Sequence, residues 1–198
     1  MCVEKTPWER VADFHGHSCP GVALGFKLAQ IANRELGVKP NPAAELIARA
    51  ETYSCALDAL QVLNQVTLGK RTLQVSEKGK HVYSFQYQAD QEILRLSVKP
   101  SVLERLAVND ESATPRQKQN RNLELIQFIL STPDSDFCTI SRVPGSLMSK
   151  PTRAPWLTCP VCGDAVRADF AVPRSDGQPV CPDCADNRPA YTSEQGGK

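Results

Sequence analysis

Two short cysteine pairs near the C-terminal end have the residue types and spacing of a metal site. Cys159 and Cys162 form the first pair, Cys181 and Cys184 form the second, and 18 residues separate the pairs. A C-x-x-C turn places two thiolates on the same side of a tight turn, and two such turns supply the four corners of a tetrahedral Zn²⁺ site. Because four thiolates close the coordination shell, we expect this zinc ion to be structural, with iron as the minor alternative. A module this small would depend on its metal for most of its stability.

A second group of candidate ligands lies near the N-terminus. His15, His17 and Cys19 are spaced by two residues, so an extended segment would place their side chains on one face. Cys19 directly precedes an expected helix, and Cys55 has the same position before another helix. The partial positive charge of a helix N-terminus favours the thiolate. The two cysteines with one or both histidines would form a site with mixed nitrogen and sulfur donors, which suits zinc or another divalent metal. In the structural alternative, each cysteine packs as a small apolar residue and His15 caps a turn.

An α+β fold must position these groups. Apolar periodicity predicts a short helix over residues 8–14, a helix over 20–36, another over 56–66 and a further one over 115–130. Strands are expected over residues 45–52, 71–76, 81–88, 92–99 and 137–143. Hairpin turns are expected at Gly79 and at Ala89 and Asp90. The imperfect alternation of the strands favours helices packed on a mixed, largely antiparallel sheet.

Composition and charge exclude several functional classes. The 23 basic and 22 acidic residues give a net charge of +1, which indicates no need for nucleic acid or an anionic membrane. No apolar run reaches the length of a membrane span, and the polar N-terminus does not resemble a signal peptide. We therefore expect a cytoplasmic protein, in which eight cysteines indicate metal or redox chemistry rather than disulfides. Residues 151–198 hold five basic and six acidic side chains, so nucleic acid is not an expected partner of the ribbon.

The prolines at 133, 144, 151 and 155 mark a change of composition between the two candidate metal sites. We expect a metal-binding α+β domain over residues 1–145, a linker over 146–155, a four-cysteine zinc ribbon over 156–192 and a tail over 193–198.

Several of these motifs resemble the FmdE family of formylmethanofuran dehydrogenase proteins. The longest is Phe14–Gly25, with the sequence FHGHSCPGVALG, and it contains the first histidine and cysteine group. The resemblance continues through residues 55–61, 67–70, 79–85 and 98–100 and covers roughly residues 10–145. It includes an appended four-cysteine ribbon. The chain departs from the pattern at Gln65 and Val66, where many relatives have a cysteine.

The resemblance implies a metal site at the histidine and cysteine motif, which maps onto His17, Cys19 and Cys55, with His15 as a further candidate. It also implies association with a molybdenum or tungsten oxidoreductase. The chain has no ferredoxin-type cysteine run and is too small to hold a molybdopterin, so it would be an accessory protein of such an enzyme.

The leading hypothesis is therefore a metal-binding accessory protein. His15 would orient a ligand or carry a proton, and Asp58, one helical turn after Cys55, would face the same pocket. The alternatives are a stand-alone zinc enzyme with an open coordination position and a regulatory module that senses metal or thiol state. A homodimer is expected because the sheet needs cover. Lys70 is a candidate anion contact, and three further residues are expected to be bystanders or sheet residues: Cys2, Cys138 and His81.

Overall fold

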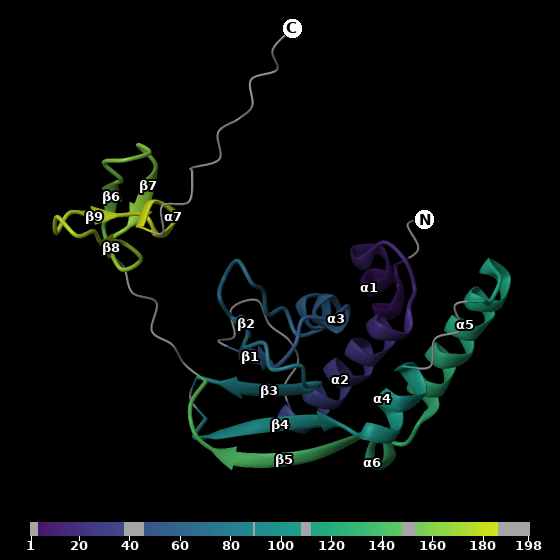
Figure 1. Cartoon of the computed structure of the whole chain (residues 1–198). Coiled ribbons are helices and arrows are strands. Elements are labelled where there is room, and N and C mark those ends of the chain that lie inside the picture. Colours follow the sequence, from purple (N-terminus) through teal and green to yellow (C-terminus); the bar gives the residue numbers. More distant parts are fainter. Residues whose placement is uncertain (1–3, 38–45, 89, 108–111, 148–153, 186–198) are drawn as a thin grey trace, which may run out of the picture. The chain divides into compact units, whose positions relative to one another are not determined.

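The computed structural model describes residues 4–37, 46–88, 90–107, 112–147 and 154–185. The chain divides into two compact units, Met1–Met148 and Ser149–Lys198 (Figure 1). Most of the expected linker, at residues 148–153, and the whole expected tail lie outside the described residues. No helix in the described ranges is long and apolar enough to span a membrane.

The first unit alternates helices with the strands of one sheet. Its elements in chain order are α1 (Pro7–His15), α2 (Pro20–Leu36), β1 (Leu46–Ala50), α3 (Ala56–Leu63), β2 (Leu73–Val75), β3 (Val82–Tyr87), β4 (Glu92–Val98), α4 (Pro100–Ala107), α5 (Pro115–Ser131), α6 (Asp134–Phe137) and β5 (Cys138–Pro144). Helices α4 and α6 were not predicted from the sequence.

The sheet has the strand order β2-β1-β3-β4-β5. β1 runs parallel to β2, with Ala48 opposite Leu73, and every other pair is antiparallel. The expectation of a mixed, largely antiparallel sheet with packed helices is confirmed. The hairpin expected at Gly79 is wrong, because β2 pairs with β1 and lies apart from β3. A short polar turn between two strand-like runs does not reveal that the first run crosses over to another partner.

Local sequence determines where the first two helices begin and end. Thr6 and Glu9 form a reciprocal capping box at the start of α1, and Gly16 ends that helix with a left-handed φ of 93°. Helix α2 begins at Pro20, with the Cys19 side chain as its N-cap, and Gly37 ends it in the same left-handed conformation. A stretch of only four residues, Gly16–Cys19, therefore joins the two helices and carries two of the candidate ligands.

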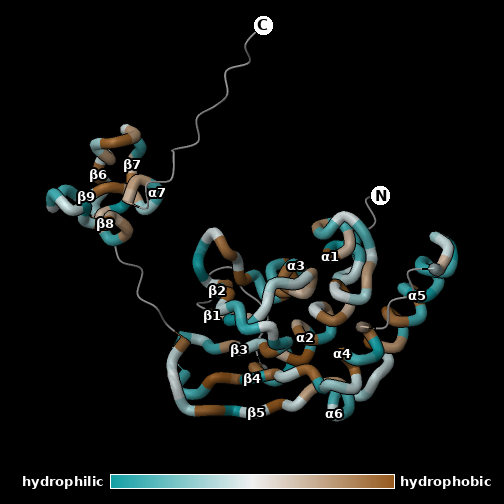
Figure 2. Tube along the Cα trace, viewed as in Figure 1, coloured by the Kyte–Doolittle hydropathy of each residue, from teal (hydrophilic) through white to brown (hydrophobic). Residues whose placement is uncertain are grey.

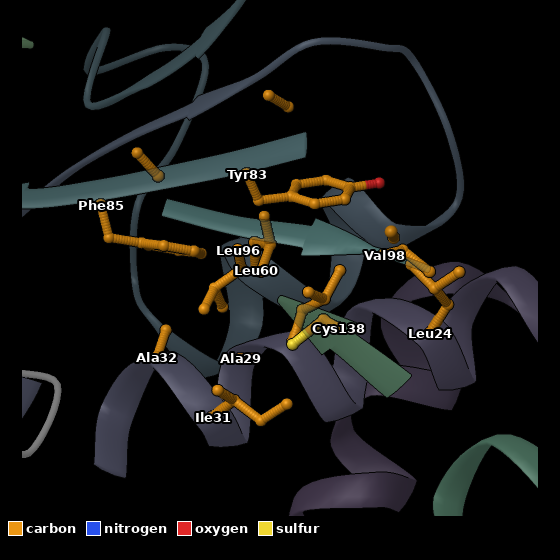
Figure 3. Packing of buried hydrophobic residues seen from close by; sticks show 14 of the residues in the cluster. Leu24, Ala29, Ile31, Ala32, Leu60, Tyr83, Phe85, Leu96, Val98 and Cys138 are labelled. Atoms are coloured by element: carbon orange, nitrogen blue, oxygen red, sulfur yellow. The ribbon is translucent and has the colours of Figure 1, made fainter. Parts of the chain in front are cut away.

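The core lies between the sheet and the helices that pack on it. Figure 2 shows apolar residues gathered along the strands and on the facing helix α2. Tyr83 and Phe85 of β3 and Leu96 of β4 are fully buried and pack against side chains of α2 and α3 (Figure 3). This packing fixes α2 and α3 on the sheet and so fixes the two helix N-termini that carry Cys19 and Cys55.

Helices α2 and α3 approach each other closely at one glycine. A Cβ atom added to Gly25 would collide with the backbone of Ala56, so only glycine fits at this crossing. Ala56 is the first residue of α3. The contact therefore holds the start of α3 against α2, one and a half turns beyond Cys19.

The second unit contains two small antiparallel ribbons and one short helix. Its elements are β6 (Trp156–Thr158), β7 (Ala165–Arg167), β8 (Val172–Pro173), β9 (Pro179–Val180) and α7 (Pro182–Ala185). β6 pairs with β7, and β8 pairs with β9. In the described part of this unit, the buried residues are Val180 and three cysteines, Cys159, Cys181 and Cys184.

Candidate metal centres

The structure brings His15, His17 and Cys19 together at the junction of α1 and α2. One nitrogen of each histidine and the Cys19 sulfur all lie within 4.8 Å of one another. His15 Nε2 lies 3.7 Å from Cys19 Sγ, and the two imidazole ring centroids are 4.6 Å apart. The left-handed turn at Gly16 reverses the chain between the two histidines and makes this convergence possible. Two imidazoles and one thiol form a donor set that suits a borderline divalent metal such as zinc.

Asp58 fixes the orientation of the His15 ring from the neighbouring helix α3. The His15 Nδ1 atom lies 2.7 Å from Asp58 Oδ2, and Gln61 donates to the other carboxylate oxygen at 3.3 Å. A carboxylate accepts hydrogen bonds, so this contact places the ring proton on Nδ1 and leaves the Nε2 lone pair free on the side of Cys19. A carboxylate behind a histidine is the usual arrangement around metal-bound imidazoles.

The Cys19 thiol occupies the N-cap position of α2. The backbone N–H of Val22 donates to Cys19 Sγ at 3.4 Å. This hydrogen bond and the partial positive charge of the helix N-terminus both favour the thiolate, which is the form that binds metals.

Cys55 lies beside Cys19 but outside the group of three converging donors. A Cβ atom on Gly21 would lie 3.5 Å from Cys55 Sγ and 3.8 Å from Cys19 Sγ, so this glycine leaves room for both sulfurs. Burial raises the pKa of the Cys55 thiol, and the neighbouring Cys19 raises it further. Where the sequence led us to expect His17, Cys19 and Cys55 as ligands, the structure places His15 among the converging donors and Cys55 next to them.

Gln61 is a further site residue that the sequence reading did not single out. Its position three residues after Asp58 places the two side chains on one face of α3, and this spacing is the signal that identifies it.

A buried polar chain approaches the same helix N-terminus from the sheet. His81 Nδ1 lies 3.0 Å from the Tyr83 hydroxyl, which lies 3.2 Å from the hydroxyl of Ser54, the residue before Cys55. Burial raises the pKa of Tyr83 to about 12 and lowers the pKa of His81. The structure thus gives His81 a partner within the sheet.

The remaining sequence candidates lie away from this group. Lys70 is exposed in a turn where its backbone N–H donates to Thr67. Cys138 belongs to the hydrophobic core, and burial raises its pKa to about 11. Cys2 lies outside the described residues.

The four C-terminal cysteines form a second donor group, within the second unit. The sulfurs of Cys159, Cys162, Cys181 and Cys184 lie within 4.8 Å of one another, with Cys162 and Cys181 Sγ 3.8 Å apart. Gly163, with a φ of 80°, ends the first cysteine turn. Backbone N–H groups of Cys162 and Cys181 donate to Cys159 and lower its pKa to about 6, which favours the thiolate. This arrangement agrees with a four-cysteine zinc ribbon.

Comparison with known proteins gives matches centred on the first unit. The family model described as "FmdE, Molybdenum formylmethanofuran dehydrogenase operon" matches residues 14–139. A curated protein from Archaeoglobus fulgidus, named a probable S-adenosyl-L-methionine-binding protein, is 34% identical over 93 residues. That match covers 45% of this chain and only 25% of the Archaeoglobus protein.

A solved structure has the same fold over nearly the whole chain. It is a tungsten formylmethanofuran dehydrogenase FmdE-like protein from Syntrophus aciditrophicus. The TM-score is 0.61 at 23% sequence identity, and the match covers 92% of this chain and 91% of the other.

Proposed function

The chain belongs to the FmdE family, and from this premise we propose that it is a metal-binding accessory protein of a molybdenum or tungsten oxidoreductase. The observation that carries the metal-binding part is the convergence of His15, His17 and Cys19 within 4.8 Å. The oxidoreductase association rests on the description of the family. Zinc at both donor groups and a cytoplasmic location belong to the same proposal.

His15, His17 and Cys19 would hold the ion, with Asp58 orienting His15. Cys55 is close enough to Cys19 to serve as a fourth ligand or to remain a free thiol beside the ion. A divalent metal held by three protein ligands supplies Lewis acidity and lowers the pKa of a bound water. This open coordination supports the second candidate function, a stand-alone metalloenzyme. A free Cys55 thiol beside a bound ion supports the third, a thiol-sensing module.

The proposed partner surfaces are less defined than the site. Ile140 and Val143 of the edge strand β5 are exposed at 36% and 37%, which supports a second copy or a partner protein at this edge.

The substitution Asp58→Asn tests the proposed centre. The asparagine side chain would keep the size of the aspartate but lose the charge that holds the proton on His15 Nδ1. We expect the affinity for Zn²⁺ at this centre to fall about 10–100-fold, as measured by competition with a chromophoric chelator. Asp134→Asn is the control, because Asp134 pairs with Arg34 away from the site. An unchanged affinity in Asp58→Asn would remove the proposed role of this carboxylate.

Purification of the tagged chain from its native cells tests the association with an oxidoreductase. We expect molybdenum or tungsten to elute with the chain in a fixed ratio, because an accessory protein of this kind stays bound to its enzyme. An unrelated protein with the same tag is the control, and elemental analysis is the measurement. Elution of the chain without either metal under low-salt conditions would contradict the association and leave the metal-binding proposal standing.

A further inference from the structure

A cavity of about 350 Å³ lies among helices α1, α2 and α3, apart from the proposed metal centre. Its walls come from the first half of α1, the second half of α2 and the end of α3. Cys19 caps the opposite end of α2, and Phe26 and Asn33 of the cavity lie 7 and 14 residues further along. At the rise of an α-helix this is a separation of about 10–20 Å along the axis. The volume lies in the range of sites for small organic molecules.

One wall of the cavity is apolar and held in place by packing. Phe26, Val62 and Leu63 form this wall. The Trp8 ring packs edge-on against the Phe26 ring, with centroids 5.3 Å apart and an interplanar angle of 83°. A fixed aromatic ring beside two aliphatic side chains suits a flat or apolar ligand body.

Polar groups on the other walls lack partners of their own. Gln65 lines the cavity, and its Oε1 atom is buried with no hydrogen-bond donor among the described residues. Gln65 also has a φ of 56°, in the left-handed region that non-glycine residues rarely adopt. Buried acceptors in folded proteins are nearly always paired, and strained backbone gathers at binding sites. A ligand with an N–H group would supply the missing donor.

Arg10 contributes a positive charge to the same cavity. No ion pair or hydrogen bond joins its guanidinium to the described part of the chain, whereas Lys5 on the preceding turn pairs with Asp13. Gln30 and Asn33 add amide groups, and Asn33 Oδ1 accepts from buried Asn64 at 2.7 Å. An arginine beside amides is a typical receptor for a carboxylate or phosphate.

We propose that this cavity is a binding site for a small organic anion with a flat apolar body and an N–H donor. The apolar wall takes the body, Gln65 accepts from the N–H group, and Arg10 binds the anionic group. The site does not depend on the metal centre.

Three related probes test the proposal by NMR titration of the full chain. Indole-3-acetate has the flat body, the N–H donor and the carboxylate; naphthalene-1-acetate lacks the donor, and indole-3-acetic acid methyl ester lacks the charge. We expect indole-3-acetate to bind at millimolar concentration or below and each of the other two to bind about tenfold more weakly. The indole N–H of Trp8 reports the event, because its ring contacts Phe26.

Matched variants identify the cavity as the place of binding. Gln65→Ala and Arg10→Ala are each expected to weaken indole-3-acetate about tenfold, and Val62→Phe to block it by filling the cavity. Gln178→Ala and Arg174→Ala, which remove exposed residues of the second unit, are the controls and should leave the affinity unchanged. Cys19→Ala should also leave it unchanged, which separates this site from the metal centre. Equal affinity for the three probes, no binding of indole-3-acetate, or binding unaffected by both cavity variants would overturn the proposal.

Discussion

Removal of the metal from the four-cysteine group is expected to unfold the second unit and to leave the first unit folded. The described part of the second unit buries one aliphatic side chain, Val180, together with three of the four cysteines. Its two ribbons contain strands of only two or three residues. Such a core cannot offset the conformational entropy of about 30 ordered residues, so the metal must supply the difference. Structural zinc binding contributes about 10–16 kcal/mol in comparable small modules.

The chain offers a direct measurement, because each unit contains one tryptophan: Trp8 in the first unit and Trp156 in the second. In a ¹H–¹⁵N spectrum of Cys184→Ala, amide signals from β6 and β7 should collapse to random-coil positions, while the Trp8 indole signal stays in place. Treatment of the unaltered chain with a strong chelator should reproduce the collapse. Cys138→Ala is the control, since this cysteine lies in the core of the first unit. Dispersed β6 signals in both metal-free samples would show that the unit folds without metal.

Local signals in the sequence predicted most elements of the first unit. Pro20 and Gly37 delimit α2 because proline suits the first helical turn and glycine suits the left-handed C-cap, and both effects act within a few residues. The four-cysteine group was equally accessible, since each pair is local and the two pairs are alike. Helix α4 was missed because it begins directly at Pro100, and a short amphipathic helix after a strand has little periodicity to detect.

Features set by long-range packing could not be predicted in the same way. The parallel pairing of β1 with β2 depends on the chain path through α3, and no residue in either strand encodes the partner. The contact between His15 and Asp58 joins residues 43 positions apart. It exists because Gly25 lets α3 approach α2 and because the Gly16 turn points His15 toward α3. The sequence identified the residue types at the centre, whereas packing decides which imidazole has the carboxylate behind it.

Replacement of Cys19 by alanine is expected to reduce the metal content of the chain from two ions to one. Cys19 supplies the sulfur of the three-donor group, and the Val22 N–H and the helix N-terminus favour its thiolate form. Loss of a direct ligand should weaken binding by more than the 10–100-fold or so that follows loss of a hydrogen-bond partner outside the coordination shell. The ion at the four-cysteine group should remain, since it is bound by a different unit.

The stoichiometry of paired variants assigns each ion to its group. Cys159→Ala should also retain one ion, and the Cys19→Ala, Cys159→Ala double variant should retain none, as measured by elemental analysis after gel filtration. Cys55→Ala decides between the two ligand sets: a loss of one ion would make Cys55 a ligand, as the sequence motif implies. Retention of two ions would favour His15, His17 and Cys19 as the ligand set, which is the group that converges in the structure. One ion in both the unaltered chain and Cys19→Ala would leave the four-cysteine group as the sole metal site and would end the proposal of a metal centre at the helix N-termini.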